Sequence, residues 1–144
     1  IAGPPENLFK EDALMERNNA NLSGSLGEEY AAEYLRERGY EIAAVNYRVR
    51  GGEIDIIARR DGFIAFVEVK TRKRGALSPG YEAVSAAKRR RIIAAARHFL
   101  YRYPVNLQPR FDVLCLETAP GEEFQVLSAE YYENAFWAEG YSPF

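Results

Sequence analysis

Apolar residues recur at helical spacing in two segments of the chain and form short runs typical of strands elsewhere. Spacings of three and four predict a helix over residues 22–38, ended by Gly39. The same spacing predicts a longer helix over residues 81–102, which stops before Pro104. Strands are predicted over residues 40–48, 53–60, 63–72 and 110–117, with a weaker strand over 124–127 and a short helix over 129–137.

The order of the main elements, helix-strand-strand-strand-helix-strand, indicates an α/β protein. A helix between the third and fourth strands implies a parallel crossover, so the central sheet should be mixed and flanked by helices. Residues 23–144 are expected to form this single domain, because a chain of 144 residues is long enough to bury one core. Residues 1–22, with Pro4-Pro5 and little periodicity, are interpreted as an N-terminal extension.

Charge is distributed unevenly along the chain, although the total is only −2. Residues 46–112 hold 15 basic and 6 acidic side chains, a net charge of +9. The flanking segments are acidic, at −5 over residues 1–45 and −6 over residues 113–144. A basic block can recruit a phosphate backbone or can simply form a solvated helix face, and charge alone favours neither.

Cysteine content and hydropathy indicate the compartment. A single cysteine, Cys115, excludes an internal disulfide and favours a reducing environment. No apolar run reaches the roughly 18 residues that span a bilayer, and no signal-peptide core is visible. We therefore expect a soluble, cytoplasmic protein without a membrane partner.

Asp61-Gly62 lies between the second and third predicted strands and is a strong signal for a two-residue hairpin turn. With that turn, Asp55 lies directly opposite Glu68. In the same register Glu53 lies opposite Lys70. The four charged side chains then share one face of the sheet, because side chains alternate along strands.

Two carboxylates on opposed strand positions have Cβ atoms about 5 Å apart, which destabilises a sheet unless a cation or a proton intervenes. A hard divalent cation, Mg²⁺ or Mn²⁺, suits carboxylate and carbonyl oxygens. Lys70 follows Glu68 by about 6–7 Å along the strand, within reach of an attacking water or a phosphoryl oxygen. Acids and a lysine in this pattern indicate metal-assisted phosphodiester hydrolysis.

Glu28 and Lys88 lie on the otherwise apolar stripes of the two predicted helices. Glu28 either forms a capping box with Ser25 or reaches the metal site, and we favour the metal site because the helix should already begin at Leu22. Lys88 either extends its ammonium group to the surface or contacts substrate phosphate near the metal. The arginines at positions 89–91 widen the basic patch around Lys88, although each of them individually is interpreted as solvated charge.

Several motifs occur in an order typical of one group of nucleases. They are Gly27-Glu28, Asn46-Tyr47-Arg48, Gly52-Glu53-Ile54-Asp55, Phe66-Val67-Glu68-Val69-Lys70-Thr71-Arg72, Glu82-Ala83-Val84 with Lys88, and Arg110-Phe111-Asp112-Val113. Together they resemble the PD-(D/E)xK nuclease superfamily, and more closely the bacterial YraN-type family, whose members look like archaeal Holliday-junction resolvases. The resemblance covers residues 18–117 and rests on the spacing of all these motifs.

The resemblance implies a restriction-endonuclease-like core and a role for each acidic residue. Asp55 would be the central metal ligand and Glu68 the second. The Val69 carbonyl and Glu28 would complete the site around Mg²⁺ or Mn²⁺, and Lys70 would orient the nucleophilic water. Resolvase-like nucleases act as dimers, so the same analogy suggests a homodimer. Contacts to nucleic acid are expected from the surrounding basic residues Arg48, Arg72, Lys73, Lys88 and Arg91.

The leading functional hypothesis is a Mg²⁺-dependent DNA endonuclease, with branched or junction DNA as a candidate substrate. The alternative is a non-catalytic module that binds nucleic acid or recruits a partner while retaining the nuclease fold, which the acidic ends of the chain leave open. Salt-sensitive binding that is indifferent to metal and to Glu68→Gln would distinguish the alternative from the leading hypothesis.

Overall fold

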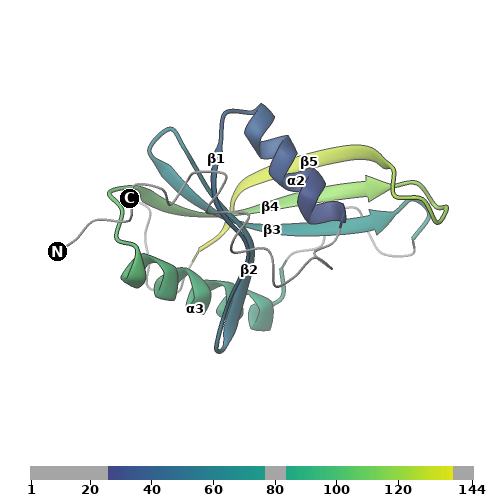
Figure 1. The fold of residues 1–144 in the computed structure, drawn as a ribbon. Coiled ribbons are helices and arrows are strands. Elements are labelled where there is room, and N and C mark those ends of the chain that lie inside the picture. The colour runs from purple at the N-terminus through teal and green to yellow at the C-terminus, as the bar shows by residue number, and fades with distance from the viewer. Residues whose placement is uncertain (1–25, 77–83, 138–144) are drawn as a thin grey trace.

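The computed structural model describes residues 26–76 and 84–137, which form two helices and a five-stranded sheet (Figure 1). The predicted N-terminal extension, residues 1–22, lies outside these ranges. The helices are α2 (Leu26–Glu37) and α3 (Ala86–Arg102), and neither has the length and apolar character needed to cross a membrane. The strands are β1 (Glu41–Val49), β2 (Gly52–Arg60), β3 (Phe63–Lys73), β4 (Gln108–Thr118) and β5 (Val126–Phe136).

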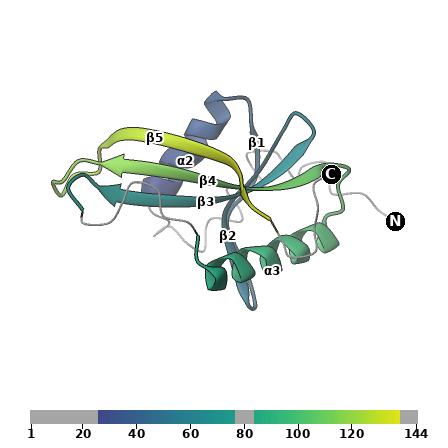
Figure 2. The same ribbon diagram turned by 180° about the vertical axis from the view of Figure 1, so that it is seen from behind.

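The five strands lie side by side in chain order, β1-β2-β3-β4-β5. Every neighbouring pair is antiparallel except β3 and β4, which are parallel and connected through α3. Twist turns the β1–β2 hairpin across the direction of β3, β4 and β5 (Figures 1 and 2). The predicted α/β class with a mixed central sheet is confirmed, and the arrangement is that of a restriction-endonuclease-like core.

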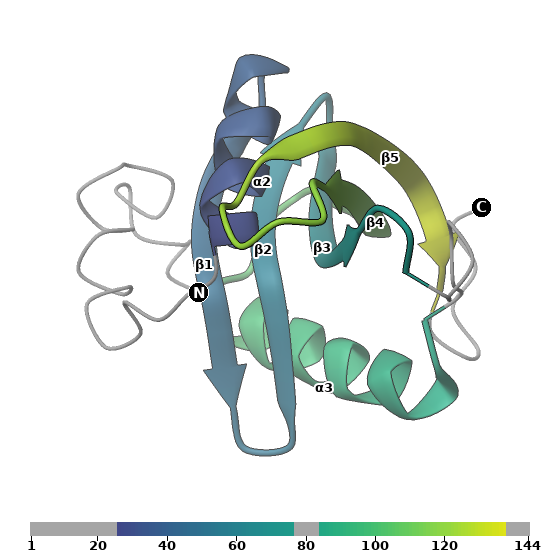
Figure 3. The same ribbon diagram turned by 90° about the vertical axis from the view of Figure 1, so that its right-hand side faces the viewer.

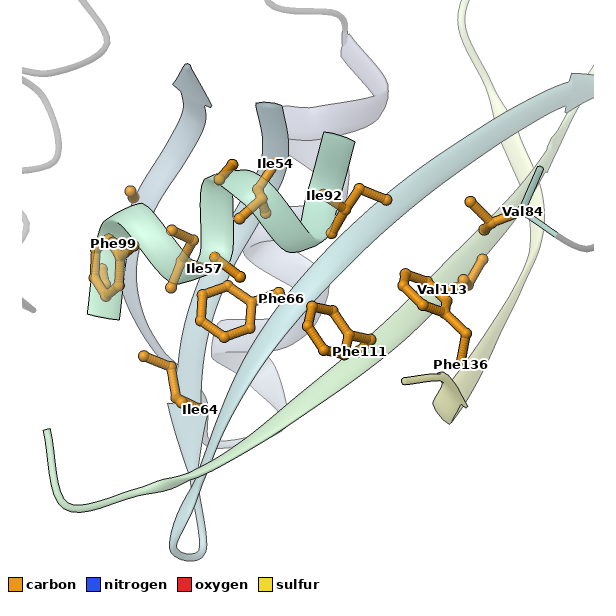
Figure 4. Close-up of a cluster of buried hydrophobic side chains, with 14 residues drawn as sticks. Ile54, Ile57, Ile64, Phe66, Val84, Ile92, Phe99, Phe111, Val113 and Phe136 are labelled. Carbon is orange, nitrogen blue, oxygen red and sulfur yellow. The ribbon is translucent and has the colours of Figure 1, made fainter. Parts of the chain in front are cut away.

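The two helices cover opposite faces of the sheet, and each face carries its own apolar core (Figures 1 and 3). On the α3 side, Ile57 and Phe66 pack against Phe99 (Figure 4). Their strand neighbours Ile56 and Val67 pack on the α2 side. Successive side chains point to opposite faces of a strand, so a sheet that is covered on both faces needs continuous apolar runs.

The hairpin between β2 and β3 has the predicted register next to its turn. The ladder runs from the Asp61-Gly62 turn to the pair Ile56–Val67. The two turn residues have φ angles of 51° and 82°, the positive values that this kind of turn requires. Beyond Ile56 and Val67 the ladder ends, so the predicted direct pairing of Asp55 with Glu68 is wrong as a strand pairing.

Val126–Phe136 forms an edge strand, β5, where the sequence predicts a weak strand followed by a short helix over residues 129–137. The helix prediction is wrong. Alanine and glutamate favour helix locally, but β4 offers this segment a ladder of backbone partners. Strand pairing also packs side chains that a surface helix would expose, since Phe136 stacks on Phe111 with ring centroids 5.1 Å apart.

The start of α3 lies further along the chain than the sequence predicts. Its first residue is Ala86, and the hydroxyl of Ser85 caps it by accepting a hydrogen bond of 3.2 Å from the backbone N–H of Lys88. Val84 is buried but not helical, so the apolar spacing that includes it overestimates the helix. The serine cap sets the boundary. Residues 77–83, which include the predicted start, lie outside the described ranges.

The first turns of α3 pack closely against the start of β2 at Gly52. A Cβ atom at Gly52 would lie 2.3 Å from the backbone carbonyl oxygen of Arg91, which is far inside van der Waals contact. Glycine is therefore required for this approach of helix to strand. The approach brings α3 across the β1–β2 hairpin and places Lys88 beside the charged end of β2 (Figure 3).

Candidate active site

The regular pairing of β2 with its neighbours breaks at Asp55. On β1 the facing residue, Asn46, has a φ of 55° and takes no part in the ladder. Side-chain alternation shifts at the same place, because Val45 packs on the α2 side and Tyr47 on the α3 side. Toward β3, Oδ2 of Asp55 accepts a hydrogen bond of 2.8 Å from the backbone N–H of Val69. The Asp55 carboxylate thus lies in an opening between β2 and β3.

Three carboxyl groups from three different elements meet at this opening. The carboxyl group of Asp55 lies within interaction distance of that of Glu68 on β3 and of that of Glu28 on α2. The side chain of Asn46 also lies beside the carboxyl group of Glu28. The structure therefore brings together the three acids that the sequence singles out. The capping-box alternative for Glu28 involves Ser25, which lies outside the described residues.

Burial and crowding raise the pKa of each of the three acids. Burial is the main cause for Glu68, and the adjacent charge of Asp55 adds to it and raises the pKa to about 8. The pKa of Glu28 is raised by burial and then by the charge of Asp55. Burial also raises the pKa of Asp55, although the hydrogen bond from Val69 lowers it. In the absence of a cation, the Asp55–Glu68 pair therefore retains a proton near neutral pH.

Lys88 of α3 brings a positive charge to the cluster. Its Nζ donates a hydrogen bond of 2.9 Å to Oε1 of Glu53 and lies 3.7 Å from Oε1 of Glu68. Burial lowers the pKa of Lys88, but the hydrogen bond to Glu53 and the charges of Glu68 and Asp55 outweigh burial and raise it. Glu53 also pairs with Arg48 at 3.8 Å. Lys88 thus points inward to the acids rather than extending to the surface.

The donors in this opening suit a divalent cation. Oε2 of Glu68 is buried and has no hydrogen-bond partner among the described residues. The carbonyl of Val69 points to the β2 side, as its N–H does, because both groups of one strand residue face the same neighbour. Within the described ranges, no group of three or more His, Cys, Asp or Glu side chains is arranged so that it could hold a metal ion by itself. Two carboxylates, one carbonyl and several waters nevertheless form a coordination shell that Mg²⁺ accepts.

Lys70 lies two residues beyond Glu68 on β3, and its charge lowers the pKa of that acid. Side-chain alternation from the buried Phe66 puts Lys70 on the α3 face together with Glu68. The predicted rung between Lys70 and Glu53 is wrong as a strand pairing, because the β2–β3 ladder ends at the pair Ile56–Val67. Lys70 therefore lies near the acids because of its position on β3, and not because it pairs with a residue of β2.

The other basic residues predicted to contact nucleic acid lie at different distances from the acids. The charges of Arg48 and Arg91 both lower the pKa of Glu53, which places them at the margin of the cluster. Arg72 and Lys73 lie at the far end of β3, opposite the end of β4. The structure thus brings Arg48, Lys88 and Arg91 to the site and leaves Arg72 and Lys73 outside it.

Asn46 belongs to the cluster but is not among the predicted site residues, and Glu53 is predicted opposite Lys70 on the same face rather than bonded to Lys88. Asparagine adopts positive φ more readily than most residues, so an Asn inside an apolar strand is the available signal for the break at Asn46. Glu53 binds Lys88 because α3 approaches β2 closely at Gly52. No local sequence pattern near Glu53 predicts that approach.

A second buried acid, Asp112 on β4, forms an ion pair with Arg110 and accepts hydrogen bonds at both of its carboxylate oxygens. Nε of Arg110 donates to both carboxylate oxygens, at 2.9 and 3.0 Å. The Tyr131 hydroxyl donates to Oδ2 at 2.5 Å, and the backbone N–H of Asn134 donates to Oδ1 at 2.8 Å. Arg110 also donates to the hydroxyl of Tyr40 at 2.7 Å. This network ties β5 to β4, so its acid has a structural use.

The mixed sheet, the helices on its two faces and the acids at a break between two strands define a protein of the restriction-endonuclease-like class. Comparison with protein families gives the particular group. Residues 27–116 match the model of the uncharacterised protein family UPF0102, and the chain belongs to this family. The resemblance to the YraN-type family is thereby confirmed. The matched region contains the whole carboxylate cluster and both of its lysines.

Individual relatives are similar to this chain over nearly their whole length. A UPF0102 protein from Synechococcus is 40% identical over 127 residues, which cover 85% of this chain and 97% of the relative. One from Syntrophotalea carbinolica is 44% identical over 121 residues, covering 82% and 94%. One from Symbiobacterium thermophilum is 45% identical over 116 residues, covering 80% and 96%. The names of these relatives state no activity.

Proposed function

We propose that this protein is a Mg²⁺- or Mn²⁺-dependent endonuclease that hydrolyses phosphodiester bonds in DNA, with branched or junction DNA as the first candidate substrate. One observation carries the proposal. Asp55, Glu68 and Glu28 are forced together at a break in the sheet, and a buried oxygen of Glu68 is left without a hydrogen-bond partner among the described residues. Such a cluster is costly to a fold unless a cation completes it.

The side chains of Asp55 and Glu68 and the carbonyl of Val69 are the groups that would hold the cation, with Glu28 reaching the same place from α2. When bound, a divalent cation supplies positive charge at the scissile phosphate and acidifies a neighbouring water. Asp55 and Glu68 would hold the cation as ionised carboxylates. The hydrogen bond from the Val69 N–H fixes the orientation of the Asp55 carboxylate.

The two lysines act from different elements. Lys70, on the same strand as Glu68, orients the attacking water and stabilises the negative charge that develops on the phosphoryl oxygens. Lys88 is held in place by Glu53 and can contact a substrate phosphate beside the acids. Arg48 and Arg91, at the margin of the cluster, add attraction for the flanking phosphates.

Cleavage assays test the proposal. The purified protein is incubated with four-way-junction, single-stranded and duplex DNA, each with Mg²⁺, with Mn²⁺ and with EDTA. We expect cleavage only with metal, and a loss of about 10³-fold or more in Asp55→Asn and Lys70→Met, since each removes a group that acts at the reacting phosphate. Glu28→Gln and Glu29→Gln form a matched pair, because Glu29 is the exposed neighbour of Glu28 on α2.

Two outcomes would contradict the proposal. Equal cleavage by wild type and Asp55→Asn would assign the activity to a contaminant. Salt-sensitive DNA binding without cleavage, unaffected by metal and by Glu68→Gln, would instead support the alternative, a non-catalytic module that retains the nuclease fold. A loss of cleavage in Glu28→Gln but not in Glu29→Gln would place Glu28 in the site rather than in the helix alone.

A further inference from the structure

A groove of about 530 Å³ lies on the outward face of α3, away from the carboxylate cluster. The end of β5 comes down beside the first turns of α3 (Figures 2 and 3), and Trp137, which directly follows β5, lines the groove. We call this groove the α3 groove. The described residues that line it are Ala86, Arg89, Arg90, Ile93, Ala94, Arg97 and Trp137.

The α3 groove lies on a different side of the helix from the candidate active site. Ile92, Ala95 and Phe99 are buried against the sheet, and Lys88 points toward the acids from the same side. The groove residues recur at spacings of three and four on the other side of the helix. A ligand in the groove would therefore not compete with a cation between β2 and β3.

All charged side chains among the described residues of the groove are positively charged. Its three charged residues in the described chain, Arg89, Arg90 and Arg97, are all exposed. None of them makes an ion pair with another described residue. The sequence of α3 contains no acid at all. Three neighbouring guanidinium groups without a counter-charge repel one another, and a polyanion relieves that repulsion.

The apolar part of the groove adds a feature that a simple solvated charge run lacks. Trp137, the only tryptophan of the chain, is 55% exposed at the wall. Ile93, Ala86 and Ala94 form an apolar strip between the arginines. A large exposed ring beside cationic side chains is the arrangement that binds single strands, in which phosphates contact the cations and a base stacks on the ring.

We propose that the α3 groove binds a single-stranded segment of nucleic acid, with phosphates on Arg89, Arg90 and Arg97 and a base stacked on Trp137. The proposal deepens the proposed nuclease function, since the groove would hold an unpaired strand of a branched substrate. Binding in the groove does not depend on metal or on cleavage. An acidic peptide such as polyglutamate would also be attracted by the arginines, but its side chains offer no ring that could stack on Trp137.

The single tryptophan gives a direct test, because all tryptophan fluorescence of the protein comes from the groove wall. The full chain is titrated in EDTA with a twelve-residue oligothymidylate, with an abasic oligomer of the same length and with polyglutamate. We expect the oligothymidylate to quench the fluorescence and to bind about tenfold more tightly than the abasic oligomer, which has no base to stack. Its log affinity should fall with log salt at a slope of about −2, as about three phosphate contacts imply.

Variants locate the binding. Arg90→Ala and Arg97→Ala should each weaken oligothymidylate binding about fivefold in an anisotropy assay, whereas Arg102→Ala, an exposed arginine of the same helix outside the groove, should not. Trp137→Ala should lose the advantage of the base over the abasic oligomer, and Trp137→Phe should restore part of it. Circular dichroism checks that each variant is folded.

The outcomes separate this inference from the nuclease proposal. Quenching by polyglutamate but not by oligothymidylate would overturn it in favour of an acidic peptide partner. Equal affinity for the oligothymidylate and the abasic oligomer would overturn the stacking role of Trp137. Metal-dependent cleavage with unchanged fluorescence would reject the groove and keep the nuclease. Quenching without any cleavage would keep the groove and reject the nuclease, and the Asp55→Asn variant should bind the oligothymidylate as wild type does.

Discussion

The acid Asp112 and the cluster around Asp55 are buried in the same sheet, but their carboxyl groups have different kinds of neighbours. Asp112 is bonded at both oxygens, by Arg110, by a tyrosine hydroxyl and by a backbone N–H. At Asp55, by contrast, the nearest groups include two more acids. The ammonium group of Lys88 lies 3.7 Å from Glu68, whose second oxygen has no hydrogen-bond partner among the described residues.

The difference shows what this fold can do for a buried carboxylate. The strands supply an arginine, a hydroxyl and an amide to Asp112, so a structural acid can be satisfied completely. The cluster at Asp55 is not satisfied in this way, although Lys70 and Lys88 are close to it. We infer that Asp112 serves stability and that the cluster is kept for an external cation. The two regions should therefore respond to mutation in opposite directions.

The largest effect is expected from Asp112→Asn. The substitution leaves the Arg110 guanidinium, only 10% exposed, without its main counter-charge, and breaking a buried pair in this way costs about 3–5 kcal/mol of unfolding free energy. Tyr131→Phe removes one hydrogen bond to the same acid and should cost only about 1 kcal/mol. Urea denaturation measures both. A cost at Asp112 no larger than that at Tyr131 would contradict a structural role for the network.

Glu68→Gln should change stability in the opposite direction. In the metal-free protein the pKa of Glu68 is about 8, against 4.5 for an ordinary glutamate, so the folded state holds the proton more tightly. The stability that this proton contributes is therefore present at pH 4 and is lost as the pH rises toward 8. Gln cannot ionise, so the variant should be more stable than wild type at pH 9, by on the order of 2 kcal/mol.

Melting temperatures in EDTA at pH 5 and pH 9 measure this difference. At pH 5 the two proteins should melt close together, because Glu68 is protonated in the folded state. At pH 9 the variant should melt higher by roughly 2–8 °C. The same offset at both pH values, or a variant that is less stable at pH 9, would contradict the raised pKa of Glu68.

Cation binding should depend on pH because the cation displaces the proton of the Asp55–Glu68 pair. With the pKa of Glu68 at about 8, the apparent affinity for Mg²⁺ should rise about tenfold per pH unit below pH 8 and level off above it. Calorimetry at pH 6.5 in buffers of different ionisation enthalpy should detect release of about one proton per bound ion. Affinity that is flat from pH 6 to pH 9 would show that the pair is not the binding site.

Lys88→Met is expected to have the smallest effect, and its sign depends on pH. The ammonium group lowers the pKa of both Asp55 and Glu68. Its removal should therefore raise the pH above which the affinity for Mg²⁺ no longer increases. Above that point the loss of a nearby positive charge should strengthen binding about two- to fivefold, as expected for a partly exposed charge. Arg91→Met, one turn further along α3, is the control and should change affinity less. Weaker binding in Lys88→Met at pH 9 would contradict this electrostatic account.

The β2–β3 hairpin could be predicted from sequence because its determinants are local. Asp61-Gly62 fixes the turn, and alternation of side chains then fixes which residues face each other up to Ile56 and Val67. The acids beyond that pair still lie close together, as predicted. The ladder between the two backbones has ended there, and the side chain of Asp55 accepts the hydrogen bond from the Val69 N–H instead. A local pattern can place residues near one another without describing how the backbone accommodates them.

Other features depend on tertiary contacts that no local pattern shows. Val126–Phe136 is a strand because β4 pairs with it, against the local helix preference of its alanines and glutamates. The bond between Lys88 and Glu53 exists because Gly52 allows α3 to approach β2. The network at Asp112 joins residues of β4 and β5 to Tyr40, which directly precedes β1, and only the folded sheet brings these residues together.

We infer that the acids at the break between β2 and β3 form a divalent-cation site. The decisive experiment is a crystal soaked in Mn²⁺ and measured at the manganese absorption edge. We expect an anomalous peak between the carboxylates of Asp55 and Glu68, about 2.2 Å from an oxygen of each and near the Val69 carbonyl. The absence of any peak between the two carboxyl groups at saturating Mn²⁺ and pH 8.5 would contradict a cation site there.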